Sequence, residues 1–211
     1  MASQLEVELK LILDEPGHVR LAEVLAAEHG PGQVLEQRNR FFDTADRRLR
    51  RAGLNLRLRR EALRDGHRER LVMTCKRAAA AAMGGIHRHD EWEAEIDPAL
   101  WELPAAELPL RLPLPEPHTE ALGQATTELI GGFANRRIEW HLPTALACLD
   151  RTVFSGPAGE RIDHELEVES AEPDPASWRR RFAALGLAWR EQPATKFARF
   201  LEHLQVRTRV K

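Results

Sequence analysis

Polar and apolar residues alternate with a period of two along several stretches of the chain, the pattern of half-buried β-strands. In the first stretch, residues 4–13, the charged side chains of Glu6, Glu8 and Lys10 share one face, and leucines and Val7 share the other. Similar segments recur along the chain, and we expect eight strands. They lie at about 4–13, 33–43, 54–59, 67–76, 86–96, 133–142, 145–154 and 160–169.

Helical spacing and helix-start signals appear between and after these strands. Asp14 and Pro16 open a helix that Gly30 ends, and Asp174-Pro175 opens another. We expect further helices near 119–130, ended by Gly131-Gly132, and near 195–206. The sequence therefore predicts a protein of mixed α and β structure.

Turn and loop signals divide the remaining sequence. Residues 97–118 contain six prolines, a density that excludes a long regular element. Asp65-Gly66 predicts a hairpin turn. The alanine-rich stretch 78–85 ends in two glycines and predicts a loop or a helical turn.

Charged residues of both signs occupy one face of nearly every predicted strand. An ordinary half-buried sheet presents such a face to water, with its apolar face under helices. The same pattern also fits a sheet of about eight strands closed into a barrel, charged inside and apolar outside. The spacing by itself leaves both architectures open.

The charged faces indicate a particular chemistry if they meet in one enclosure. Carboxylates at alternate positions of a strand repel each other unless a cation lies between them, and hard divalent cations prefer oxygen ligands. Arginine and lysine beside them suit a polyphosphate, because a guanidinium binds phosphate oxygens in a bidentate manner. Together these groups suit metal-assisted phosphoryl transfer. The sequence contains no Walker motif, no His-Glu-x-x-His motif and no Gly-x-Ser-x-Gly motif.

Composition excludes several partners. The net charge of −2 gives no bulk attraction to nucleic acid, so we expect no nucleic-acid partner. No apolar run approaches the roughly 18 residues of a membrane span, and the charged N-terminal residues leave no signal-peptide core, so we expect no membrane association. Cys75 and Cys148 form no metal-binding cluster. We expect a cytoplasmic protein with free thiols.

Several motifs resemble the CYTH, or triphosphate tunnel metalloenzyme, superfamily. Glu6-Val-Glu8-Leu-Lys10 is similar to its N-terminal Glu-x-Glu-x-Lys signature. The resemblance spans roughly residues 5–200 and is nearest to the CYTH half of bacterial inorganic triphosphatases that carry a CHAD domain. Further segments follow in the family's order: Gln37–Thr44, Gly53–Arg59, Leu71–Lys76, Glu91–Glu93, the Arg137 strand, Asp150, Glu165–Glu169 and Thr195-Lys196.

The resemblance implies an α+β fold built on a closed eight-stranded antiparallel β-barrel, a tunnel with a charged lumen flanked by helices. A chain of 211 residues suits one domain. We therefore expect residues 1–211 to form a single CYTH domain. Its parts are tunnel strands at about 4–96 and 133–169, a proline-rich and helical insert at about 97–132, and C-terminal helices at about 174–206.

The resemblance also assigns roles to individual side chains. Of the adjacent bases Arg136 and Arg137, the alternation favours Arg137 as the inward one. The implied catalytic residues are Glu6, Glu8, Lys10, Arg57 and Arg59. The implied triphosphate-binding residues are Lys10, Arg57, Arg59, Lys76, Arg137 and Lys196. The implied ligands of Mg²⁺ or Mn²⁺ are Glu6, Glu8, Asp150, Glu165, Glu167 and Glu169.

The implied function is metal-dependent hydrolysis of the terminal phosphate of a small triphosphate, with inorganic tripolyphosphate favoured. Hydrolysis of thiamine or nucleoside triphosphate, class IV adenylyl cyclisation, and a non-catalytic polyphosphate-binding module are the alternatives. The triphosphate is the only partner that we expect, and the chain is expected to be a monomer or a homodimer.

Other noticeable residues have simpler interpretations. We expect His87 and His89 on a solvated or lumen-edge strand, and Arg38 and Arg40 on a basic surface. Cys75 alternates with Lys76 and is predicted to be a buried, inert thiol. The predicted packing residues are Trp92, Trp140, Trp178, Phe182 and Trp189.

Overall fold

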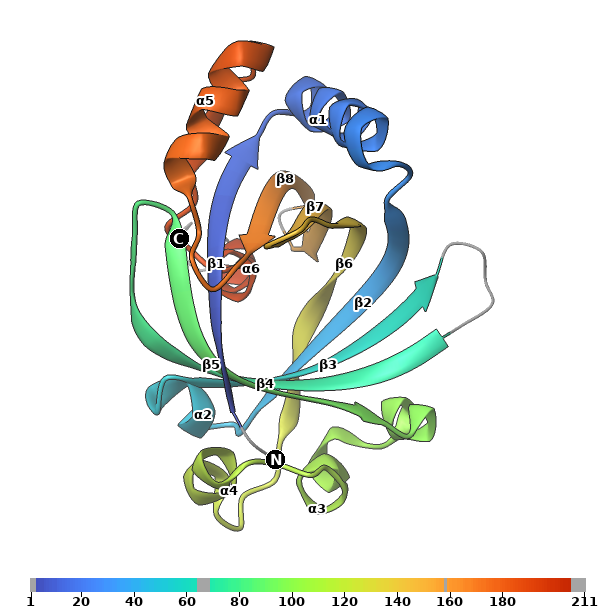
Figure 1. Cartoon of the computed structure of the whole chain (residues 1–211). Coiled ribbons are helices and arrows are strands. Elements are labelled where there is room, and N and C mark those ends of the chain that lie inside the picture. The colour runs from blue at the N-terminus through green and yellow to red at the C-terminus, as the bar shows by residue number, and fades with distance from the viewer. Residues whose placement is uncertain (1–2, 64–68, 158, 206–211) are drawn as a thin grey trace.

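The computed structural model describes residues 3–63, 69–157 and 159–205, so the predicted Asp65-Gly66 turn lies outside the described residues. One antiparallel sheet runs in the order β5-β4-β3-β2-β6-β7-β8-β1-β9, and pairing of β5 with β1 closes the first eight strands into a barrel (Figure 1). The strands are β1 (Gln4–Leu13), β2 (Gln33–Asp43), β3 (Leu54–Leu63), β4 (Glu69–Met83), β5 (Ile86–Ile96), β6 (Glu128–His141), β7 (Leu146–Gly156), β8 (Gly159–Glu169) and the short β9 (Trp189–Glu191). The predicted closed antiparallel barrel is confirmed, and the open-sheet alternative is excluded.

Helices flank the barrel on opposite sides. Figure 1 shows α1 and α5 at one side and α2, α3 and α4 at the other, while α6 lies behind the barrel opening. The helices are α1 (Glu15–His29), α2 (Arg48–Arg51), α3 (Leu108–Arg111), α4 (Glu116–Leu122), α5 (Pro175–Leu185) and α6 (Lys196–Gln205), with 3₁₀ helices η1 (Pro98–Glu102) and η2 (Ala105–Glu107). Within the described part of the chain, no helix has the length and apolar character that crossing a bilayer requires.

The apolar faces of the strands pack outward, under the helices. Leu56 and Leu58 of β3 belong to a core shared with α2, α3 and α4, and Leu9 and Leu11 of β1 belong to a core shared with α1 and α5. These four leucines are at most 1% exposed. The alternation therefore turns the charged residues of the same strands into the barrel.

A third apolar cluster lies at one end of the barrel, around α6. Phe41, Phe133 and Phe154 stand on the inward face of β2, β6 and β7, and Phe200 of α6 packs against all three. Phe197 of the same helix stacks on Phe41, with ring centroids 4.4 Å apart. Helix α6 thus covers one end of the lumen and brings its own charged residues to it.

The prediction of a loop or helical turn in the alanine-rich stretch is wrong for residues 78–83. Strand β4 continues to Met83 beside β5, with register shifts after Ala78 and Ala80, and the turn is confined to Gly84 and Gly85. Pairing with β5 at Ala78, Ala80 and Met83 holds this segment in the sheet and overrides the helical preference of alanine.

The predicted helix near 119–130 is displaced, and its expected stop signal has another role. Helix α4 ends at Leu122, and Gly131 and Gly132 lie inside β6, next to a register shift opposite β2. A Cβ atom on Gly132 would lie 1.9 Å from the carbonyl oxygen of Asn39. These glycines therefore permit close approach of two strands, and the last five residues of the predicted insert belong to the barrel.

Candidate active site

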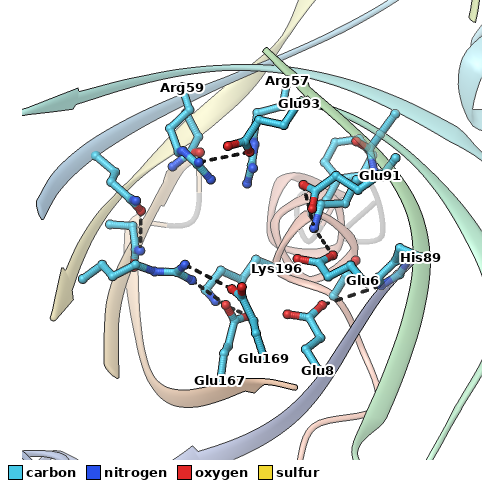
Figure 2. A pocket seen from close by; sticks show the side chains of 18 of the residues that line it. Glu6, Glu8, Arg57, Arg59, His89, Glu91, Glu93, Glu167, Glu169 and Lys196 are labelled. Atoms are coloured by element: carbon cyan, nitrogen blue, oxygen red, sulfur yellow. Dashed lines mark hydrogen bonds and ion pairs between the residues drawn. The ribbon is translucent and has the colours of Figure 1, made fainter. Parts of the chain in front are cut away.

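Inward-facing side chains surround a cavity of about 430 Å³ in the lumen (Figure 2). It combines acidic residues with lysine and arginine from seven elements. The lining includes Glu6, Glu8 and Lys10 of β1, Arg57 and Arg59 of β3, Lys76 of β4, Glu91 and Glu93 of β5, Arg137 of β6, Glu167 and Glu169 of β8, and Lys196 of α6. Of the predicted site residues, Asp150 and Glu165 are absent from this lining; both have no exposed surface and lie in the wall behind it.

Three of the predicted metal ligands converge. One carboxylate oxygen from each of Glu6, Glu8 and Glu169 can lie within 4.8 Å of the others. The backbone explains this, because Glu8 is paired with Glu169 across β1 and β8 and Glu6 stands two residues before Glu8 on the same face. Such a group of oxygen donors fits a hard divalent cation.

The pKa of Glu169 indicates that this cluster is rich in negative charge. Burial raises the pKa of Glu169 to about 7, and Glu6, Glu167 and Glu8 add to the shift, although Arg137 opposes it. A carboxyl group whose charged form is disfavoured to this degree gains from a neighbouring cation. The donor set therefore fits the predicted Mg²⁺ or Mn²⁺.

The other three predicted ligands, Asp150, Glu165 and Glu167, lie among bases. Arg137 binds Asp150 through two hydrogen bonds of 2.8 and 2.7 Å, and its Nη2 is 2.5 Å from Glu167 Oε2. Lys196 Nζ lies 2.8 Å from Asp150, 2.6 Å from Glu167 and 3.3 Å from Glu165. Burial alone raises the pKa of Asp150, but Arg137 and Lys196 outweigh it and lower the pKa to about 2. These carboxylates are already neutralised by the chain itself.

Among the bases that line the cavity, Arg57 differs in its partners. Its Nη2 donates to Thr74 Oγ1 at 3.0 Å, its buried Nε has no hydrogen-bond acceptor, and no ion pair of Arg57 is found among the described residues. Burial lowers the pKa of Arg57 to about 10, and the neighbouring charge of Arg59 adds to this. Glu91, Glu93 and Glu6 oppose this shift from a greater distance. A partly buried guanidinium without an ion pair is stabilised by an anion that binds beside it.

The remaining predicted phosphate ligands pair with acids that line the cavity. Arg59 lies 2.6 Å from Glu61 and 3.3 Å from Glu93. Lys76 forms an ion pair with Glu6 and lies 3.2 Å from Glu91. Lys10 forms an ion pair with Glu167 and lies 2.9 Å from Glu8. Lysine can exchange a carboxylate for a phosphate oxygen at modest cost, because its ammonium group donates in several directions.

Two residues of the site, Arg199 and Glu61, were not predicted from the sequence. Arg199 of α6 is 2% exposed, and its guanidinium lies 2.5 Å from Glu165 and 3.0 Å from Asp163, so it anchors the helix that carries Lys196. Its position three residues after Lys196 on a predicted helix was the available signal. Glu61 is also buried in the lumen, on the same face of β3 as Arg57 and Arg59, where its parity could have revealed it.

Of the two environments expected for His87 and His89, a solvated strand or the edge of the lumen, the first is wrong. His87 and His89 are 3% and 8% exposed, so neither is solvated. His87 Nε2 lies 2.7 Å from the carbonyl oxygen of Gln192, and His89 lines the lumen with Nε2 3.8 Å from Glu8. Burial lowers the pKa of both, which favours neutral imidazoles near Lys10 and Lys76.

The other outward and packing assignments are confirmed. Arg38 is exposed, and Arg40 packs over Trp101 outside the lumen. Arg136 points outward beside Glu36 at 3.6 Å, so Arg137 is the inward base of that pair. Both cysteines are free and buried, and burial raises the pKa of Cys75 to about 12. The predicted packing residues lie in the outer cores: Trp92, Trp140, Trp178, Phe182 and Trp189.

A family model for the CYTH domain matches residues 4–201 of this chain, which is nearly its whole length. The chain belongs to the CYTH family. No curated protein matches the sequence of this CYTH protein.

Solved structures agree on the fold of this CYTH domain. A candidate adenylyl cyclase from Hippeastrum, for which a dominant triphosphatase activity is stated, superposes with a TM-score of 0.78 at 23% identity, over 98% of this chain and 100% of that one. A candidate adenylate cyclase from Bacillus halodurans gives 0.63 at 21% identity, over 95% and 99%. A protein from Pyrococcus horikoshii gives 0.60 at 14% identity, over 93% and 98%. At these identities the likeness establishes the fold.

Proposed function

We propose that this CYTH protein hydrolyses the terminal phosphate of a small triphosphate with the help of Mg²⁺ or Mn²⁺, and that inorganic tripolyphosphate is its preferred substrate. The observation that carries the proposal is the presence, in one lumen, of three converging carboxylates and of an arginine without an ion pair among the described residues. Glu6, Glu8 and Glu169 form an acidic cluster, while Arg57 is a partly buried cation that forms no ion pair within the described part of the chain. A metal triphosphate satisfies both groups at once.

Glu6, Glu8 and Glu169 are the residues that would hold the metal. When bound, such a cation would act as a Lewis acid on the phosphoryl oxygens. We place Asp150, Glu165 and Glu167 in a supporting role, because their ion pairs hold Arg137 and Lys196 in position. We therefore propose three of the six metal ligands that the resemblance implies.

The bases of the lumen would bind and orient the triphosphate. Arg57 and Arg59 stand at alternate positions of β3 and point into the cavity (Figure 2). Lys10, Lys76 and Lys196 reach it from three further elements. Donors fixed in this way stabilise charge that develops on the leaving pyrophosphate without reorganising during the reaction. The surrounding barrel limits the access of bulk water to the phosphates.

A phosphate-release panel tests the proposed reaction. Tripolyphosphate, thiamine triphosphate and ATP are each assayed with Mg²⁺, with Mn²⁺ and with chelator, and cAMP is measured in the ATP samples. We expect metal-dependent phosphate release, fastest from tripolyphosphate. Formation of cAMP would identify a cyclase instead. Tight triphosphate binding without any turnover would identify a non-catalytic binding module, and either result would overturn the proposal.

Replacing Arg57 by alanine is expected to lower kcat/KM for the triphosphate by about 10²-fold or more, as for the loss of one preorganised donor. Arg57 has no acidic partner among the described residues, so its removal leaves no buried carboxylate unpaired and the fold is retained. The matched control is Arg38→Ala, on the outward face of the neighbouring strand β2. The measurement is steady-state kinetics on both variants. Equal kcat/KM in the two would show that Arg57 does not bind the triphosphate.

A further inference from the structure

Asn39 of β2 brings a buried amide group to the tunnel. It lines the tunnel cavity, and the residue is 4% exposed. Its Nδ2 atom donates to the carbonyl oxygen of Phe133 at 3.5 Å, whereas its Oδ1 atom accepts no hydrogen bond within the described residues. Turning the amide end for end would set its oxygen against the carbonyl oxygen of Phe133. The free atom is therefore an acceptor.

Two other amide side chains of the tunnel wall have partners for their oxygens. Gln37 and Asn135 line the same cavity and are buried. Gln37 Oε1 accepts a hydrogen bond from Asn135 at 2.8 Å, and Asn135 Oδ1 accepts one from Thr152 at 2.9 Å. Buried polar atoms are nearly always hydrogen-bonded, and an exception needs an explanation. A ligand that donates a hydrogen bond to Asn39 Oδ1 provides one.

The ligand of this oxygen must be a donor that enters the tunnel. Tripolyphosphate in its fully ionised form carries only acceptor oxygens, which an amide oxygen repels. The lysines and arginines of the lumen are donors, but within the described residues none of them reaches Asn39 Oδ1. Water is the small donor that accompanies an ionised triphosphate into the lumen, and hydrolysis consumes one water molecule.

We propose that Asn39 Oδ1 binds and orients the water that attacks the terminal phosphorus. The proposal rests on the proposed triphosphatase function and adds to it a residue that positions the nucleophile. Asn39 pairs with Arg59 across β2 and β3, so the water lies beside a base assigned to the triphosphate. In the closed barrel β2 is four places from β1, so Asn39 stands on the wall opposite Glu6 and Glu8. This placement suits in-line displacement of a pyrophosphate held near the acidic cluster, because water and leaving group occupy opposite sides of the phosphorus.

The proposed step balances without proton transfer to Asn39. The water oxygen forms a bond to the terminal phosphorus while the bond from that phosphorus to the bridging oxygen breaks. One water proton stays on the orthophosphate, and the other passes to an oxygen of the leaving pyrophosphate. An amide oxygen is too weak a base to take a proton at neutral pH, so Asn39 acts by orienting the water.

Replacing Asn39 by leucine tests the proposal, because leucine has nearly the shape of asparagine but no acceptor. With tripolyphosphate and saturating Mg²⁺, we expect kcat to fall by about 10²-fold. KM, and the Kd of the bis-methylene analogue of tripolyphosphate measured by calorimetry, are expected to stay within about threefold, since the substrate loses no contact. The matched control is Gln124→Leu, which removes an exposed amide outside the tunnel lining and is expected to change none of these constants.

Asn39→Asp distinguishes orientation of the water from a structural role. It keeps an oxygen at the same place but adds negative charge beside the triphosphate, so we expect KM to rise by about 10-fold or more. Its kcat is expected to stay above that of Asn39→Leu, because the acceptor is retained. This variant also carries the test if circular dichroism shows that Asn39→Leu does not fold. An unchanged KM in Asn39→Asp would overturn the proposal.

Failure of this inference and failure of the proposed function give different results. Unchanged kcat in a folded Asn39→Leu would show that the water needs no such acceptor. Analogue affinity that falls as much as kcat would show that Asn39 binds phosphate instead. Both results overturn the role of Asn39 and leave the proposed hydrolysis standing. Binding of the analogue by the unmodified chain, without turnover of tripolyphosphate, would overturn the proposed function and the role of Asn39 with it.

Discussion

Replacing Glu6 and Glu8 together by glutamine is expected to abolish triphosphate hydrolysis, with a fall in kcat of about 10³-fold or more. Both carboxylates belong to the three that converge in the lumen, and the amide is nearly the same size but carries no charge. A divalent cation that loses two of three anionic ligands binds weakly. Phosphate release at increasing Mg²⁺ or Mn²⁺ measures the loss of turnover. A titration with Mn²⁺ measures the loss of metal binding separately.

The fold of this double variant should persist. Lys10 keeps its ion pair with Glu167, and Lys76 keeps Glu91 at 3.2 Å, so neither lysine is left without an acidic partner. The matched control is Glu36→Gln with Glu128→Gln, two strand positions where the carboxylates are exposed and bind only arginine at the surface. It is expected to retain full activity. Near-normal turnover of Glu6→Gln/Glu8→Gln at saturating Mg²⁺ would rule out the assigned metal site.

Replacing Arg199 by methionine is expected to destabilise the protein by about 3–5 kcal/mol, the usual cost of breaking a buried ion pair from one side. Arg199 neutralises Glu165, which has no exposed surface, and Asp163, which is 8% exposed. Methionine fills a similar volume beside Phe154 but removes the closer cation of Glu165, which keeps only Lys196 at 3.3 Å, and leaves Asp163 with Arg161. For a chain of this size we expect a fall in Tm on the order of 10 °C, measured by calorimetry or circular dichroism.

A second substitution tests whether lost charge or lost packing destabilises Arg199→Met. Adding Glu165→Gln to Arg199→Met removes the charge of one of the two carboxylates that lost Arg199, so part of the lost stability should return. Arg180→Met, at a position of α5 whose side chain is 73% exposed, should change the free energy of unfolding by no more than about 0.5 kcal/mol. Equal stability of Arg199→Met and Arg180→Met would show that the buried ion pair does not hold α6 in place.

Arg199 also connects stability to the site. It lies one helical turn after Lys196, whose ammonium group contacts Asp150, Glu165 and Glu167. Without the ion pairs of Arg199, α6 is held less firmly against the barrel, and Lys196 moves with it. A small misplacement of a binding group can cost a large factor in rate. We therefore expect KM for the triphosphate to rise in Arg199→Met even at temperatures where the variant is folded.

The alternation of side chains determined which face of each strand is charged, and this needed no tertiary information. Because the period of a strand is two, the inward position of Arg137 and the outward position of Arg136 followed from their neighbours alone. The strand starts and the caps of α1 and α5 were likewise local: Asp14 and Asp174 accept hydrogen bonds from Gly17 and Ser177. Strands β4 and β6 were predicted too short, at 67–76 and 133–142, because strand pairing overrode the local signals at residues 77–83 and 128–132.

Only the tertiary structure decided whether the charged faces enclose a cavity and which charges meet inside it. Closure depends on the pairing of β5 with β1, two strands far apart in the sequence. Register places Glu8 opposite Glu169 and Lys10 opposite Glu167, so that of six similar carboxylates Glu6, Glu8 and Glu169 converge on one another, and the other three converge on Lys196. Such pairings are set by contacts over the whole barrel, and a local pattern of period two carries no information about them.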